Sequence, residues 1–186
     1  MKTRKILSGA FLTLALAFGS SSFAQKTVMV GGAAMYPTKN IVENAVNSKD
    51  HTTLVVAVGA AGLVETLKSA GPFTVFAPTN EAFAKLPKGT VEFLLKPENL
   101  KTLQTILTYH VVAGKMNAKD IAKAIKAGNG KATMKTVSGG TLTAWMEGKN
   151  VMITDENGKS AMVTIADVNQ SNGVIHVIDA VVTPKV

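Results

Sequence analysis

The spacing of the apolar residues changes along this chain, and the change limits the folds that the chain can adopt. In the first half, apolar residues recur every three or four positions, as Leu100, Leu103 and Leu107 do, which is the spacing of a helix face. In the last third, apolar residues alternate within short runs that Gly and Asn-Gly pairs separate, a pattern typical of strands joined by tight turns. Helices followed by a strand meander predict an α+β fold with mostly antiparallel strands.

The same spacing predicts the individual elements. Helices are expected over 41–46, 54–58, 63–67, 91–95, 100–107 and 117–127, and strands over 73–77, 109–112, 131–137, 141–147, 151–155, 161–167 and 174–182. Thr79 or Asn80 is expected to cap a short helix after the first strand, and Thr90 the next, because their side-chain oxygens accept from free backbone N–H groups. Asn172-Gly173 is expected to form the turn into the last strand.

Residues 1–24 have the composition of an export signal. A positively charged start precedes an apolar run over 6–18, and small residues stand at Ser22 and Ala24. The apolar run is shorter than the roughly 20 residues of a membrane span. We therefore predict a signal peptide cleaved after Ala24 and a secreted or periplasmic location, with an uncleaved N-terminal anchor as the alternative. Residues 25–36 carry little pattern and are interpreted as a flexible N-terminal extension.

The net charge is carried by lysine. The chain has a formal charge of +8, which falls to +5 without the leader, and Arg4 in the leader is its one arginine. Lysine lacks the bidentate fork with which arginine reads guanine, and only 5% of the residues are aromatic, so a nucleic-acid partner is not expected. Lys119, Lys123 and Lys126 fall on one face of a helix whose opposite face is apolar. This face is either simply solvated or a strip that binds acidic glycans or a negatively charged envelope.

Several kinds of chemistry are excluded or disfavoured by residue type and spacing. The absence of cysteine excludes disulfides, thiolate metal sites, Cys nucleophiles and a lipid-modified N-terminal Cys. His51, His110 and His176 do not have the spacing of a metal site, and no Gly-x-Ser-x-Gly motif is present. Paired carboxylates leave a glycan-acting enzyme as the least favoured class, and the carboxylates concerned are Asp155, Glu156, Asp167 and Asp179. We expect a protein with no catalytic site, no cofactor and no metal.

Four segments of the chain resemble the signatures of one family. They occur in the family's order across about 37–184 and are Phe73-Thr74-Val75-Phe76-Ala77-Pro78-Thr79-Asn80-Glu81-Ala82-Phe83, Tyr109-His110-Val111-Val112, Asp167-Val168, and Asn172-Gly173-Val174-Ile175-His176-Val177-Ile178-Asp179 with Val181-Val182-Thr183-Pro184. Together they make the chain similar to fasciclin (FAS1) domains, in particular to small secreted bacterial members with a single domain. Val168 departs conservatively from the isoleucine that family members usually carry.

The resemblance implies a fold and a class of function. The fold is a wedge-shaped β-sandwich with helices packed on one side, and residues 37–184 form the domain. Fasciclin domains are extracellular adhesion and interaction modules, and no catalytic site is general to the family. In animal relatives the regions that match Tyr109, His110, Asp167 and Val168 have been linked to integrin recognition. These four residues are therefore binding candidates beside the three lysines.

The second signature also contains residues with a structural interpretation. His176 lies among apolar neighbours in a predicted strand, where a buried neutral imidazole can tie the strand to a loop carbonyl. Thr79, Asn80 and Gly173 are interpreted as capping and turn residues of the signatures.

Two functions from different classes follow. The first is a secreted or periplasmic fasciclin-domain protein that mediates adhesion, or contact with a matrix or surface, by binding without catalysis. Its partners would be cell-surface or matrix proteins or polysaccharides, and the protein would be a monomer or a weak homo-oligomer. The alternative is a periplasmic carrier of a small lipid-like or anionic ligand, which the high aliphatic and methionine content suggests.

Overall fold

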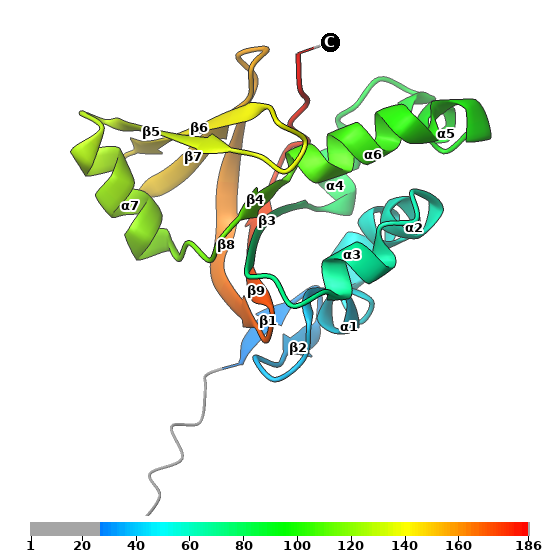
Figure 1. The fold of residues 1–186 in the computed structure, drawn as a ribbon, viewed down its shortest axis with the longest axis horizontal. Helices are drawn as coiled ribbons and strands as arrows, with labels where there is room; N and C mark the ends of the chain where they lie inside the picture. The colour runs from blue at the N-terminus through cyan, green and yellow to red at the C-terminus, as the bar shows by residue number, and fades with distance from the viewer. Residues whose placement is uncertain (1–26, 186) are drawn as a thin grey trace, which may run out of the picture.

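The computed structural model describes residues 27–185 and combines short helices with one large sheet (Figure 1). The predicted signal peptide and its cleavage site lie outside these residues. The strands are β1 Val28–Val30, β2 Ala33–Met35, β3 Phe73–Pro78, β4 Val111–Ala113, β5 Lys131–Lys135, β6 Thr141–Glu147, β7 Asn150–Thr154, β8 Ser160–Gln170 and β9 Gly173–Ile178. The helices are α1 Ile41–Ala45, α2 Thr52–Ala60, α3 Val64–Lys68, α4 Asn80–Ala84, α5 Thr90–Leu94, α6 Leu100–Tyr109 and α7 Ala118–Ala127, with 3₁₀ turns η1 Lys49–His51 and η2 Pro97–Asn99.

The large sheet has seven strands in the order β4-β3-β9-β8-β7-β6-β5. β3 and β9 pair in parallel, and the other neighbouring strands are antiparallel. The two ends of the sheet approach each other, because Val112 forms a bridge with Thr136 and the Val137 N–H donates to the Val111 carbonyl at 2.8 Å. The α+β prediction is confirmed, and the two layers of the predicted sandwich are the two ends of one continuous, nearly closed sheet.

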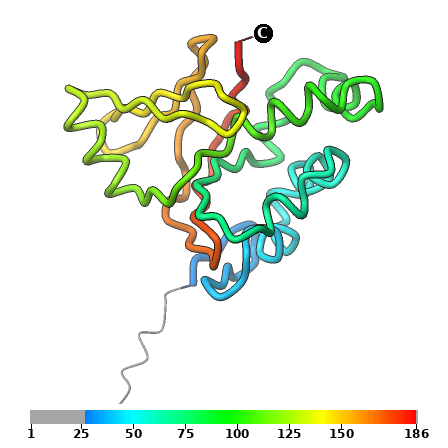
Figure 2. Tube along the Cα trace, in the orientation of Figure 1, coloured from blue at the N-terminus to red at the C-terminus, as the bar shows by residue number. Residues whose placement is uncertain are grey.

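Three groups of buried apolar residues hold the fold together. The first fills the space inside the curved sheet and includes Phe76, Tyr109 and Ile121. The second lies on the other face of β3 and β9, under α1 and the β1–β2 hairpin, and the third joins α2 to α6. Helices α1–α6 gather on one side of the molecule, as the backbone trace shows, while α7 packs at the far end against β5 and β6 (Figure 2).

The prediction of a flexible extension is wrong for residues 28–35. β1 and β2 form an antiparallel hairpin in which Val28 pairs with Met35, and Val30 and Met35 are buried in the second core. Gly31 and Gly32 make the turn with φ of 56° and 76°, a region that favours glycine. Two three-residue strands rich in Ala and Met give too short an alternation to be read from the sequence.

Of the two residues predicted to cap the helix after β3, Thr79 is confirmed. Thr79 caps α4, since its side chain accepts from the Ala82 N–H at 3.2 Å. Asn80 instead connects two elements. Its side chain accepts from the Thr53 N–H and donates to the Lys49 carbonyl, which joins α4 to the start of α2.

Two local predictions are wrong and a third is confirmed. Thr90 is not a cap, because the N-cap position of α5 is Gly89, with φ of 84° and no side chain to donate or accept. The strand predicted over 109–112 begins only at Val111, since Tyr109 ends α6. Asn172-Gly173 connects β8 to β9 as predicted, although neither residue has a positive φ.

Gly173 is needed because two backbones meet closely where β9 begins beside β3. A Cβ at Gly173 would lie 2.1 Å from the Phe73 carbonyl oxygen, and strand backbone cannot move aside cheaply. We expect Gly173→Ala to lower the free energy of unfolding by about 2–4 kcal/mol, measured by urea denaturation. Gly59→Ala is the matched control, because Gly59 is exposed in α2 with nothing within 4 Å of a Cβ. The control should be neutral or slightly stabilising; equal effects of both changes would contradict the prediction.

Candidate functional site

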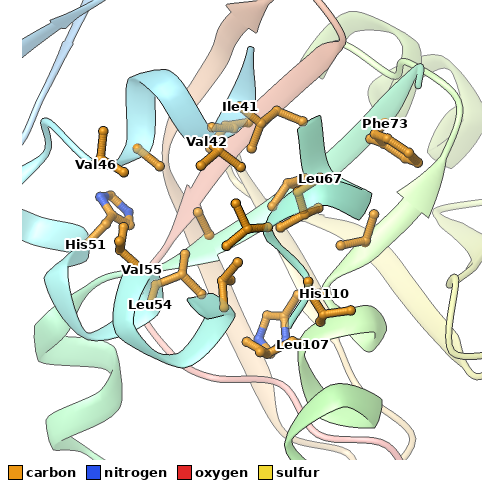
Figure 3. A pocket seen from close by; sticks show the side chains of 18 of the residues that line it. Ile41, Val42, Val46, His51, Leu54, Val55, Leu67, Phe73, Leu107 and His110 are labelled. Carbon is orange, nitrogen blue, oxygen red and sulfur yellow. The ribbon is translucent and has the colours of Figure 1, made fainter. Parts of the chain in front are cut away.

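An apolar pocket of about 490 Å³ lies between the helices α1–α3 and the face of the sheet formed by β3, β4 and β9 (Figure 3). Its walls are aliphatic: α1 contributes Ile41 and Val42, α2 contributes Leu54 and Val55, and α3 contributes Leu67. This volume is in the range of sites for small organic ligands, about 300–1,000 Å³. The sequence placed these residues in helices and gave no indication of a cavity between them.

The mouth of the pocket is marked by Val46, which follows α1 and is 56% exposed. Two charged residues contribute to the lining, and each has a partner elsewhere. The Glu43 carboxylate accepts from the Asn40 N–H at 2.9 Å, and the Lys68 ammonium pairs with Glu65 at 3.2 Å. The interior is therefore apolar, with its charges engaged at the ends of helices.

The buried side chain of Asn172 fixes the helices to the sheet around this pocket. Its Oδ1 accepts from the Ile41 N–H at the start of α1 at 3.0 Å, and its Nδ2 donates to the carbonyls of Leu67 and Ser69 at the end of α3, both at 2.8 Å. Its own carbonyl accepts from the Phe73 N–H at 3.0 Å. One residue thus positions α1, α3 and the first residue of β3.

Two polar side chains stand in the pocket wall beside η1. Ser48 and His51 are 3% and 4% exposed, and the Ser48 hydroxyl lies 2.8 Å from Nδ1 of His51. Nε2 of His51 has no hydrogen-bond partner. Burial lowers the pKa of His51, while the nearby Ala77 carbonyl acts in the opposite direction without forming a hydrogen bond of normal geometry. The ring is therefore neutral at pH 7, with one nitrogen left unpartnered.

The pair Tyr109-His110 is buried rather than presented at the surface. The Tyr109 hydroxyl donates to the Thr141 carbonyl at 2.6 Å and accepts from the Glu156 N–H at 3.1 Å, and burial raises its pKa to about 12. His110 lines the pocket, but both of its nitrogens are occupied: Nδ1 donates to the Ile106 carbonyl at 2.8 Å, and Nε2 accepts from the Val182 N–H at 3.3 Å.

Asp167 and His176 act together on the segment that leads into α7. Nε2 of His176 donates to the Met116 carbonyl at 2.8 Å, and its Nδ1 accepts from the Asp167 N–H at 3.4 Å. The Asp167 carboxylate accepts from the Ala118 N–H at 2.7 Å, at the start of α7. Val168 is 1% exposed in the second core. Burial thus leaves Tyr109, His110 and Val168 no direct contact with a partner, and only Asp167 is partly exposed.

The three lysine candidates are brought together on α7. Lys119, Lys123 and Lys126 are exposed, and the ion pairs within residues 27–185, Lys68–Glu65 and Lys85–Asp179, do not involve them. Asp120 on the same helix accepts from the Asn117 N–H at 3.1 Å, so it closes the helix start. We refer to these three side chains as the lysine face.

The carboxylates considered for a glycan-acting enzyme accept hydrogen bonds from backbone N–H groups. Asp155 accepts from the N–H groups of Asn157, Lys159 and Thr183, and Asp179 accepts from the Met162 N–H. In the part of the chain that the structure describes, no group of three acidic or histidine side chains is placed to hold a metal ion. Over the same residues, no helix has the length and apolar character of a membrane span.

Comparison with known proteins identifies the family to which the chain belongs. A family model, "Fasciclin domain", matches residues 49–184. The chain belongs to the fasciclin family. The fold agrees: a solved FAS1 domain pair from the insect cell adhesion molecule fasciclin I superposes with a TM-score of 0.68 at 19% identity, covering 76% of this chain and 50% of that one.

Relatives of this fasciclin protein occur in bacteria and animals. It is 45% identical to protein sll1483 of Synechocystis over 91% of this chain and 87% of the relative. Immunogenic protein MPB70 of Mycobacterium bovis is 34% identical over 75% of this chain and 66% of the relative. Human periostin is 33% identical over 73% of this chain, which spans only 15% of periostin.

The pocket, Asn172 and the Ser48–His51 pair were not found by sequence reasoning. Asn172 carried a signal, since it begins the second signature, but the Asn-Gly pattern suggested a backbone role instead of a side-chain one. Ser48 and His51 are three residues apart in a stretch of weak periodicity, and nothing in their spacing indicates that they face a cavity.

Buried neutral histidines predict that the stability of this protein falls in acid. Burial lowers the pKa of His110 from 6.5 to about 4, with the Ile106 carbonyl and Asp155 acting against it, and burial also lowers the pKa values of His51 and His176. The unfolded chain therefore binds protons first, so stability is full above pH 6.5 and falls as the pH drops toward 4. At pH 5.5 His110 alone accounts for a loss of about 1.4 kcal/mol.

We expect His110→Gln to make this decline shallower, although the variant is less stable at neutral pH. Urea denaturation at pH 7.5 and at pH 5.5, where carboxylates stay mostly ionised, measures the difference for each protein. An identical decline in the variant and the parent protein would show that His110 does not carry the effect.

Proposed function

We propose that this fasciclin-domain protein is exported and binds surfaces outside the cytoplasm without catalysis, in adhesion or in contact with a matrix or envelope. The family supports the class of function, since fasciclin I, whose domain pair shares this fold, is a cell adhesion molecule. The lysine face carries the proposal. Its three exposed positive charges favour an anionic partner, for which an acidic polysaccharide is our proposal.

The lysine face is suited to this role because the helix that carries it is fixed. α7 buries Ile121 and Ile125 in the first core, and its first turn is held by Asp167 through the Ala118 N–H. Three exposed ammonium groups on a rigid helix can meet a repeating anionic chain without first losing backbone freedom. Exposed charges act over about 10 Å at 0.1 M salt, so the binding must weaken as salt is added.

The test compares two triple variants that remove the same charge. Lys119, Lys123 and Lys126 are changed to Gln in the first variant, and binding to alginate, an acidic polysaccharide, is measured at low and high salt. We expect affinity to fall about tenfold, because three exposed charge contacts of about 0.5 kcal/mol each are lost. Neutral dextran is the control ligand and should not bind.

The matched control changes Lys88, Lys96 and Lys101 to Gln. These lysines are also exposed, but they lie around α5 and α6, away from the lysine face. We expect this variant to bind alginate within about twofold of the parent protein. Equal weakening of both variants would show that net charge alone is responsible, and a parent protein that does not bind alginate would overturn the proposed partner.

The pocket favours a second function, a carrier of a small apolar ligand. About 490 Å³ of aliphatic-lined space between helices and sheet is a cavity that a folded core of this size does not need. The anionic ligand that the sequence left open is disfavoured, because the interior offers no free charge to an anion.

A tryptophan at position 55 tests the carrier function by filling the pocket. Native mass spectrometry of the parent protein, isolated directly from producing cells, should show a bound small molecule that Val55→Trp lacks. Val56→Trp is the matched control, because Val56 is the next residue of α2, is 59% exposed and does not line the pocket. Ligand-free spectra of the parent protein in every preparation would count against a carrier.

A further inference from the structure

One end of the apolar pocket contains a buried polar group without a partner, and this group limits what the pocket can hold. The His51 ring is 4% exposed and lies in the pocket wall beside Val46 and Val55 (Figure 3). Its Nε2 makes no hydrogen bond. An unpartnered polar atom in an apolar setting is destabilising by about 1–3 kcal/mol, and a ligand that satisfies it recovers that free energy on binding.

The hydrogen bond on the other side of the ring decides whether Nε2 donates or accepts. If Nδ1 carried the proton, it would donate to Ser48, and both the Ser48 hydroxyl proton and Nε2 would lack partners. If the Ser48 hydroxyl donates to Nδ1, the proton is on Nε2, and only that N–H lacks a partner. The second tautomer leaves fewer unsatisfied groups. Nε2 is therefore a donor.

Among the described residues, no other side chain that lines the pocket has a buried nitrogen or oxygen without a partner. His110 lines the wall near Leu107, but its two nitrogens bind Ile106 and Val182. Glu43 and Lys68 are held by Asn40 and Glu65. A matching ligand thus has a single polar group at one end and an apolar body.

We propose that the pocket binds a neutral, elongated apolar molecule that ends in a carbonyl oxygen, with that oxygen accepting a hydrogen bond from Nε2 of His51. The carbonyl end lies at η1 and the apolar body extends along β3 toward Leu67 and Phe73. An ionised carboxylate fits less well, because burial keeps His51 neutral and so provides no charge to replace the lost hydration of the anion. This assignment rests on the carrier function proposed for the pocket.

The test uses three probes that differ only at one end. The first is a naphthalene fluorophore with a dimethylamino group at one end and a propionyl ketone at the other; the second has propyl in place of propionyl, and the third has a carboxylate there. Equilibrium dialysis against the purified protein gives a dissociation constant for each. We expect the ketone to bind about fivefold more tightly than the propyl probe, which corresponds to one hydrogen bond, and more tightly than the carboxylate.

His51→Phe removes the donor and keeps the size of the ring. We expect it to abolish the preference for the ketone while the propyl probe still binds within about twofold. The Gln variant of the lysine face is the control and should bind all three probes as the parent protein does. If His51→Phe does not fold, the parent protein still decides: a hydrogen-bonded ketone emits at longer wavelength than the same dye in an apolar solvent.

The outcomes separate this inference from the carrier function. Equal affinity for the ketone and propyl probes, or tighter binding of the carboxylate, overturns the role of His51 and leaves a carrier without polar selection. Failure of the folded parent protein to bind any probe overturns both.

Discussion

The structure depends on one buried side chain that joins its helices to its sheet. Asn172 starts the parallel pairing of β9 with β3 and uses both ends of its amide to hold α1 and α3. An aliphatic side chain there would leave the Ile41 N–H and the carbonyls of Leu67 and Ser69 without partners, which is destabilising by about 1–3 kcal/mol for each group. Asn172 thus fixes α1 and α3, two of the helices that line the pocket, to the strands of the sheet that form its opposite wall.

Two of the three histidines join separate segments of the chain through hydrogen bonds, and the third leaves one ring nitrogen without a partner. His110 joins the end of α6 to the C-terminal segment, and His176 joins β9 to the loop before α7. Each is buried and uses both nitrogens, one as donor and one as acceptor, which fixes the neutral tautomer. His51 is buried to the same degree but uses only one nitrogen. His110 and His51 both line the pocket, but only His51 has a nitrogen left over for the proposed ligand.

Periodicity and the signatures were sufficient to predict the α+β class, the strand meander and the family, because alternation and turn residues are local properties. Thr141–Glu147 was predicted to the residue for this reason. The β1–β2 hairpin was missed because its strands have three residues each, and their burial comes from contact with distant strands. The binding role expected for Tyr109, His110 and Val168 conflicts with burial that no local pattern reveals. A cavity is still less predictable, since it depends on the spacing between layers and not on the identity of any lining residue.

The two proposed binding regions lie in different parts of the molecule, because the pocket is between α1–α3 and one face of β3 and β9, whereas the lysine face is on α7, which packs against β5 and β6. Val75 of β3, and Ile175 and Val177 of β9, face the helices and the pocket side, whereas His176 faces the other way and holds the approach to α7. A ligand in the pocket binds only the folded protein, so it stabilises the β3–β9 pair by mass action. The proposed carrier and surface-binding functions therefore use separate parts of one small domain, and no lysine of the lysine face lines the pocket.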